Sequence, residues 1–304
     1  MTELAPRHRL RTWLTWIGGL LSLGGLVFVV QRLVAYAGLI DLASLSPLGC
    51  GALLLLAVIY GAANCLLAAG WWQLLRGLEV PGRFAWATRA YAISQLAKYV
   101  PGNVFQFVGR QALGVAAGFG NGPLLKSTVL ELLILAGAGA VFAPLVVPRL
   151  ATVWTALGFV PVMPAWAWVG AFVLAVTLGL WLLRHFGGPQ MLRAGLCYGA
   201  FVAISGVVFA GCFIVAGGSA SWPALGSLIA AYVIAWLVGL LTPGAPAGLG
   251  MREAVLLVLL SGMASEPVIL LAIVLGRAVT VLGDVGFYAA GALTAPTEAQ
   301  EVAR

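Results

Sequence analysis

The chain has 304 residues, of which 62% are hydrophobic and only 8% are charged, and its formal net charge is +7 at pH 7. Because soluble domains carry about 25% charged residues, this composition excludes a soluble globular protein. Recurrent apolar runs of about 18 residues or more indicate membrane-spanning helices, and the absence of a basic run argues against nucleic-acid binding.

The first predicted element is 13–31, which follows the basic start "RHRLR". Its apolar run of about eighteen residues exceeds the roughly 7–15 residues of a cleaved signal peptide, so we expect an uncleaved first helix. The later candidate spans, in chain order, are 48–75, 84–100, 103–120, 125–147, 165–183, 195–217, 223–241, 247–262 and 267–292. A β-barrel is excluded, because its strands alternate apolar and polar residues over about ten positions.

A Pro-Gly pair breaks the apolar sequence twice, between 84–100 and 103–120 and between 223–241 and 247–262. All four segments are shorter than the roughly 20 residues that a helix needs to cross a bilayer. The expected fold is therefore an all-α polytopic membrane protein, with about six full spans and two re-entrant hairpins. Its domain organisation is a single transmembrane domain over 1–304.

The basic residues orient these elements, because Lys and Arg concentrate in cytoplasmic loops. They precede the first span and recur in 76–89 and in 184–193, whereas 32–47 and 148–164 are poor in charge. This pattern predicts a multi-pass protein of the cell (inner) membrane with both termini in the cytoplasm. By parity, the first broken hairpin enters from the cytoplasm and the second from the opposite face.

The two breaks share the pattern P-G-x7-R-[Q/E]-A, which predicts an inverted-topology repeat with halves of roughly 48–147 and 195–293. The matching residues are Pro101, Gly102, Arg110, Gln111 and Ala112 in the first break, and Pro243, Gly244, Arg252, Glu253 and Ala254 in the second.

Broken helices of this kind suit a transporter, because unwound backbone survives at membrane depth only where protein or water satisfies it. Helix N-termini that begin after each break would present N–H groups to a central cavity. An arginine about two turns into each helix would add a charge suited to phosphate. We expect both Pro-Gly motifs, including Gln111 and Glu253, to form an anion site. The alternative is that Pro-Gly marks tight turns between full spans, with Arg110 and Arg252 paired to carboxylates as structural braces.

Other ionisable residues lie in apolar runs, where they usually have a function or a dedicated partner. Lys98 could bind a headgroup or extend to the interface. Glu131 is predicted to pair with a cation such as Arg110, or alternatively to couple protons. Arg277 and Asp284 lie seven residues apart, so each could pair along one helix face or with another helix. This inner group has a surplus of one positive charge, which favours an anionic guest.

At these residues the chain resembles the transmembrane region of lysylphosphatidylglycerol synthases and its stand-alone relatives. The likeness is carried by "SQLAKYVPGNVFQFVGRQALG", by "LTPGAPAGLGMREAVLL" and by "GRAVTVLGDVGFYAAGAL". The resemblance implies a flippase that moves an anionic or aminoacylated phospholipid between leaflets. The functional positions it implies are the Pro-Gly segments, Arg110, Glu131, Arg252, Glu253 and Arg277. The aminoacyl-transferase domain of the bifunctional synthases has no counterpart in the sequence, so lipid aminoacylation is not expected. The run "PGAPAGLG" departs from the simpler glycine-rich run of the family, so substrate details do not transfer.

Lipid translocation is thus the leading hypothesis, with an anionic membrane lipid as the ligand and a homodimer or a lipid-modifying transferase as a protein partner. An integral membrane transferase that acts on a lipid-phosphate is the first alternative, and a non-transporting lipid-binding scaffold is the second. No catalytic constellation or metal motif is recognisable, because the only histidines, His8 and His185, lie at predicted membrane edges. No cofactor is expected.

Overall fold

The computed structural model describes residues 46–100, 104–150, 163–219, 221–242 and 250–294. Within these ranges the chain is helical and forms no strand, apart from one isolated bridge between Ser261 and Ala264. The helices are α2 (Pro47–Gly77), α3 (Phe84–Gln95), the 3-10 helix η2 (Leu96–Tyr99), α4 (Phe105–Ala116), α5 (Asn121–Ala140), α6 (Ala143–Val146), the 3-10 helix η3 (Val147–Leu150), α8 (Ala165–Val215), α9 (Trp222–Leu241), α10 (Met251–Leu260) and α11 (Glu266–Leu293). The expected span 13–31 lies outside the described residues.

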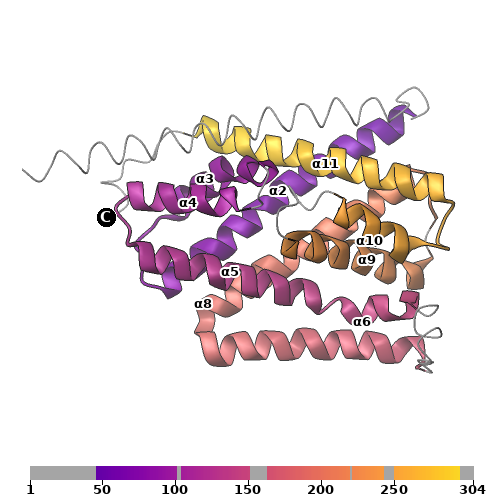
Figure 1. The fold of residues 1–304 in the computed structure, drawn as a ribbon, viewed down its shortest axis with the longest axis horizontal. Coiled ribbons are helices and arrows are strands. Elements are labelled where there is room, and N and C mark those ends of the chain that lie inside the picture. Colours follow the sequence, from indigo (N-terminus) through magenta and orange to yellow (C-terminus); the bar gives the residue numbers. More distant parts are fainter. Residues whose placement is uncertain (1–45, 101–103, 151–162, 220, 243–249, 295–304) are drawn as a thin grey trace, which may run out of the picture.

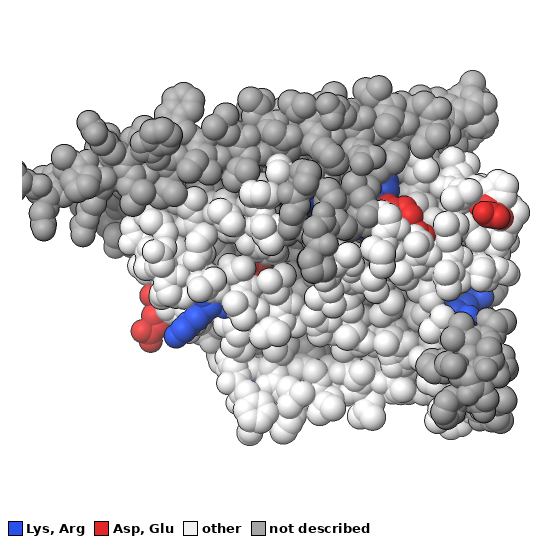
Figure 2. Space-filling view, viewed as in Figure 1, with Lys and Arg blue, Asp and Glu red and all other residues white. Residues whose placement is uncertain are grey.

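Five of these helical segments are long and apolar enough to cross a membrane, as expected for a multi-pass membrane protein. They are Pro47–Gly77, Asn121–Leu150, Trp166–Val215, Ala224–Leu241 and Glu266–Leu293. The all-α class is therefore confirmed. In Figure 2 the described part of the visible face is largely uncharged, as a surface that contacts lipid must be.

α8 contains both predicted helical segments, 165–183 and 195–217 (the second as far as Val215), and a reversal between them. The connection is shorter than the polar loop expected over 184–193, because only Gly188 departs from helical geometry there. The backbone of Gly188 has φ 72° and ψ −170°, a conformation open to glycine, and Pro189 follows it. Figure 1 shows the two arms of α8 folded back from this bend. Each arm exceeds the roughly 20 residues of a membrane-crossing helix.

Short helices flank both Pro-Gly breaks. α3 and α4 have 12 residues each and α10 has 10, which at about 1.5 Å per residue is too short for a hydrocarbon core of about 30 Å. The prediction that all four segments are too short fails for α9, whose 20 residues are sufficient by length and composition. Pro101, Gly102, Pro243 and Gly244 lie outside the described residues.

The two ends of the helix bundle differ in charge. Figure 1 places the end of α2, the α4–α5 connection, the kink of α8 and the end of α11 together at the left, and the starts of α2, α8 and α11 at the right. A hydrogen bond from Arg89 Nε to the carbonyl of Thr294 (3.2 Å) fastens α3 to the end of α11 at the left end. Basic residues of the described chain gather there: Arg76, Arg83, Arg89, Lys126, Arg184 and Arg193. α3 and α4 occupy the left half of the bundle, and α9 and α10 the right half.

The centre of the bundle is built by α2, which packs against α8 and α11. α2 and α11 approach so closely that a Cβ atom on Gly61 would lie 2.9 Å from the carbonyl oxygen of Gly283, and one on Gly283 would lie 2.7 Å from that of Ala57. Small residues permit this close approach of membrane helices. It brings Asn64 of α2 within reach of Asp284 of α11, where the candidate site lies.

Candidate functional site

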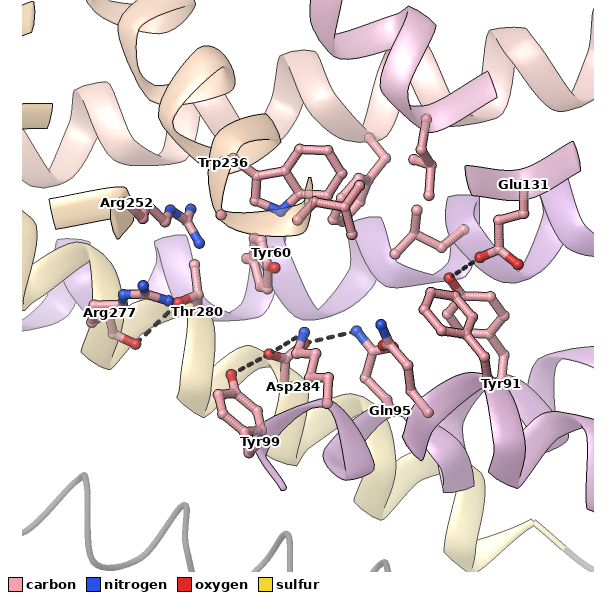
Figure 3. Close-up of a pocket in the computed structure, with 18 residues that line it drawn as sticks. Tyr60, Tyr91, Gln95, Tyr99, Glu131, Trp236, Arg252, Arg277, Thr280 and Asp284 are labelled. Atoms are coloured by element: carbon pink, nitrogen blue, oxygen red, sulfur yellow. Dashed lines mark hydrogen bonds and ion pairs between the residues drawn. The ribbon is translucent and has the colours of Figure 1, made fainter. Parts of the chain in front are cut away.

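A polar cavity lies at the centre of the bundle, with a volume of about 80 Å³. The helices on both sides of each break, α3, η2 and α4 and also α9 and α10, contribute to its walls, together with α2, α5, α8 and α11. Figure 3 shows Arg252 and Arg277 at one end, Tyr91 and Glu131 at the other, and Asp284 between them. The remaining walls are largely apolar. The ionisable residues that line the cavity are Lys98, Glu131, Arg252, Arg277 and Asp284.

Asp284 lies at the centre of the cavity, and its carboxylate interacts with four donors. Its Oδ1 accepts hydrogen bonds from Asn64 Nδ2 and Gln95 Nε2, each at 3.1 Å. Its Oδ2 accepts one from the Tyr99 hydroxyl at 2.6 Å and forms an ion pair with Lys98 Nζ at 2.7 Å. The carboxylate is fully buried, so these donors replace its water. Asp284 therefore fastens η2, the turn that precedes the first break, to α11.

Glu253 and Arg277 form the second ion pair, with 2.6 Å between Arg277 Nε and Glu253 Oε1. The other oxygen of Glu253 accepts the backbone N–H of Gly250 at 2.7 Å, at the start of α10. Gly250 has φ 84°, which glycine adopts without strain. Glu253 thus caps α10 and joins it to α11 with one carboxylate.

Glu131 and Arg110 form the third ion pair, which joins α5 to α4. Arg110 Nη1 lies 2.8 Å from one carboxylate oxygen of Glu131 and 3.0 Å from the other, and the Tyr91 hydroxyl donates to this carboxylate at 2.8 Å. The guanidinium also lies over the rings of Tyr91, Phe107 and Trp71, at 4.1, 5.2 and 5.3 Å from their centroids. Arg110 is 2% exposed, so protein surrounds its guanidinium, whereas its partner Glu131 lines the cavity.

Arg252 differs from these cations. It is 7% exposed, and no carboxylate of the described residues lies at ion-pair distance from it. Its guanidinium lies 4.4 Å from the ring centroid of Tyr232 and points into the cavity (Figure 3). The buried hydroxyl of Tyr232 lacks a hydrogen-bond partner in the described part of the chain. Arg252 thus offers its donors to the cavity.

The predicted equivalence of the two arginines is wrong, because the helices start at different distances from their breaks. Arg110 is the sixth residue of α4, whereas Arg252 is the second residue of α10. Arg110 turns toward Glu131 and does not line the cavity. Gln111, also expected at the lipid site, is turned away and donates from Nε2 to the carbonyl of Asn121 at 3.3 Å.

The other predicted residues fall into pairs that the sequence left open. Glu131 is the counter-ion of Arg110, which was one of its two predicted roles. Lys98 lines the cavity and pairs with Asp284, so it does not extend to the interface. Arg277 and Asp284 each pair with another element and not with each other. No sequence pattern singled out Asn64, Gln95, Tyr91 or Tyr99, since single polar residues in apolar helices are common.

No protein-family model matches the chain, and no curated protein matches it in sequence. In the part of the chain that the structure describes, no three His, Cys, Asp or Glu side chains are placed to hold a metal ion.

Proposed function

We propose that this protein is a flippase of the cell membrane that moves an anionic phospholipid between leaflets through the central cavity. The observation that carries the proposal is Arg252, a buried guanidinium that points into a cavity without a carboxylate partner among the described residues. The proposal also assigns the chain to the family that its motifs resemble, the transmembrane region of lysylphosphatidylglycerol synthases.

Electrostatics support an anionic ligand at Arg252. Removing an unpaired charge from water costs several kcal/mol, whereas a cation–π contact returns roughly 0.5–2 kcal/mol, so the Tyr232 ring alone does not compensate it. The position in the first turn of α10 adds to the imbalance, because a helix N-terminus has a partial positive charge. A phosphate would satisfy the guanidinium and the helix end together.

Transport is supported by the arrangement of the broken segments. α3–α4 and α9–α10 reach the cavity from opposite halves of the bundle, as two inverted re-entrant hairpins would. In each half, the helix that follows the break forms an ion pair with the next helix. Arg110 of α4 pairs with Glu131 of α5, and Glu253 of α10 pairs with Arg277 of α11, so the acid and the base have exchanged places. Such a correspondence favours a duplicated unit that alternates between two faces.

The direction of entry follows from the same arrangement. The basic end of the bundle would face the cytoplasm, so that α3–α4 enters from the cytoplasmic side and both termini are cytoplasmic. The lipid would place its phosphate at Arg252 while its acyl chains stay in the bilayer. A lipid-modifying transferase or a second copy of the chain would be the protein partner.

A flux assay tests this proposal. The purified full chain is reconstituted in phosphatidylcholine vesicles with a tail-labelled phosphatidylglycerol, and loss of the label's accessibility to an impermeant quencher is followed. We expect Arg252→Ala to slow translocation at least about tenfold, the loss that corresponds to about 1.4 kcal/mol. Arg184→Ala removes an exposed arginine of α8 and serves as the matched control.

The outcomes separate the three functions. Unchanged flux in Arg252→Ala contradicts the role of this residue. Absence of flux from the folded wild type, with lipid binding retained, favours a scaffold. Chemical conversion of the lipid would instead identify a transferase.

A further inference from the structure

Among the described residues, the cavity and the ion pairs around it carry one net positive charge. Three carboxylates, Glu131, Glu253 and Asp284, are each matched with one cation: Arg110, Arg277 and Lys98, respectively. Arg252 is the fourth cation, and it has no carboxylate partner within the described ranges. The two undescribed segments at the breaks, 101–103 and 243–249, contain no ionisable side chain in the sequence, so they do not alter this sum.

The two carboxylates that line the cavity, Asp284 and Glu131, are buried and each accept from more than one donor, whereas Glu253 does not line it. Asp284 accepts from four donors and Glu131 from both Arg110 and Tyr91. Glu253 accepts from Arg277 through one oxygen and from the Gly250 amide through the other. A ligand ammonium group that entered the cavity would have to displace one of these donors and leave a buried charge unpaired. The cavity therefore offers an anion a partner and offers a cation none.

We propose that the cavity selects lipids by net headgroup charge, and that its ligand is a phosphate diester with a single negative charge and no amine. This inference rests on the proposed function and names its substrate class. A diester monoanion neutralises Arg252 and leaves the enclosed site without net charge. A phosphate monoester at pH 8, above its second pKa of about 6, brings a second negative charge that no cation is free to meet. A zwitterionic or aminoacylated headgroup brings an ammonium that no carboxylate is free to meet.

The wild-type protein provides the first test, because it requires no variant to fold. The full chain in phosphatidylcholine vesicles at pH 8 is supplied in turn with tail-labelled phosphatidylglycerol, phosphatidic acid, phosphatidylethanolamine and lysylphosphatidylglycerol. We expect phosphatidylglycerol to move at least about tenfold faster than each of the others. Equal or faster movement of phosphatidic acid or of an amine-bearing lipid overturns the charge rule while the proposed flippase stands. Absence of movement and of thermal stabilisation by all four lipids overturns both.

Two variants then change the charge of the site in opposite directions. Asp284→Asn raises it by one, so the preference is expected to shift toward phosphatidic acid. Lys98→Gln lowers it by one, so movement of phosphatidylglycerol is expected to fall at least about tenfold although Arg252 is intact. Glu266→Gln, at an exposed position of the same helix as Asp284, changes the total charge equally and should change no preference. An unchanged order of lipids in a folded Asp284→Asn protein contradicts the proposal.

A headgroup without acyl chains distinguishes a lipid from a soluble ligand. Glycerophosphoglycerol has the same diester charge as phosphatidylglycerol, and thermal unfolding in detergent reports binding of either. Stabilisation by the lipid alone supports the proposal. Equal stabilisation by the soluble diester contradicts the lipid as substrate, and a failure of both to stabilise the protein contradicts the diester site.

Discussion

Arg110 and Arg252 show how a shared motif can place the same residue in two environments. Both stand nine positions after a proline, yet α4 begins at Phe105 and α10 begins at Met251. Arg110 is consequently deep in its helix and meets Glu131, whereas Arg252 lies in a first turn and meets the cavity. The shared motif predicted an arginine at both positions. The residue at which each helix begins depends on tertiary packing, and it decides which arginine faces the cavity.

The buried ion pair of Arg110 with Glu131 predicts that replacing Arg110 destabilises the protein. Arg110→Ala leaves Glu131 buried without its cation, and breaking a buried pair from one side costs about 3–5 kcal/mol. We expect a large fall in the midpoint of thermal unfolding of the purified protein in detergent. Joint replacement by Arg110→Met and Glu131→Leu should recover most of it, since it leaves no buried charge. A double variant no more stable than Arg110→Ala would contradict the role of this ion pair in stabilising the fold.

At the scale of elements, hydropathy predicted where the apolar helices run, and packing decided how they end. The polar letters of 184–193 predicted a loop, but Gly188 alone bends the backbone and helix resumes after it. α9 matches the predicted segment 223–241 to within one residue, and it is long enough to cross because spans can be as short as about 17 residues. The close contact of α2 with α11 could not be predicted from the sequence. Glycine is frequent throughout the chain, and nothing in the sequence distinguishes Gly61 and Gly283, which lie at this contact.

This contact predicts that Gly283 is intolerant of a side chain. Gly283→Ala places a Cβ 2.7 Å from the carbonyl of Ala57, so α2 and α11 must separate. Separation lengthens the Asn64–Asp284 hydrogen bond as well, and we expect destabilisation of about 1–3 kcal/mol from overpacking. Gly286→Ala on the same helix meets no atom within 4 Å and should be neutral or slightly stabilising. Chemical unfolding in mild detergent compares the two, and equal stabilities would contradict the close approach.

At the scale of the whole molecule, charge and topology agree. The sequence assigned 76–89 and 184–193 to one side of the membrane, and the structure gathers their basic residues at one end of the bundle. What the sequence could not predict is the cavity itself, because residues from eight separate α-helices and the 3-10 helix η2 line its described part. Only tertiary structure brings Tyr60, Gln95 and Asp284 together.

This polarity predicts which positions face each side of the cell membrane. In a variant without native cysteines, Ser221→Cys and Ser265→Cys should react with an impermeant maleimide added to intact cells. Glu79→Cys and His185→Cys, which are also exposed, should react only after the cells are permeabilised. Labelling of Glu79→Cys in intact cells would reverse the orientation, and labelling of both sets would contradict the topology.

The carboxylate of Glu253 has two duties, as it closes the first turn of α10 and secures α11 through Arg277. A shorter acid could keep one duty but would lose reach for the other, and a neutral amide would weaken both. Homologues are therefore expected to change these two positions together. In homologues that keep this pair, the neighbouring Arg252 should point in the same direction as here.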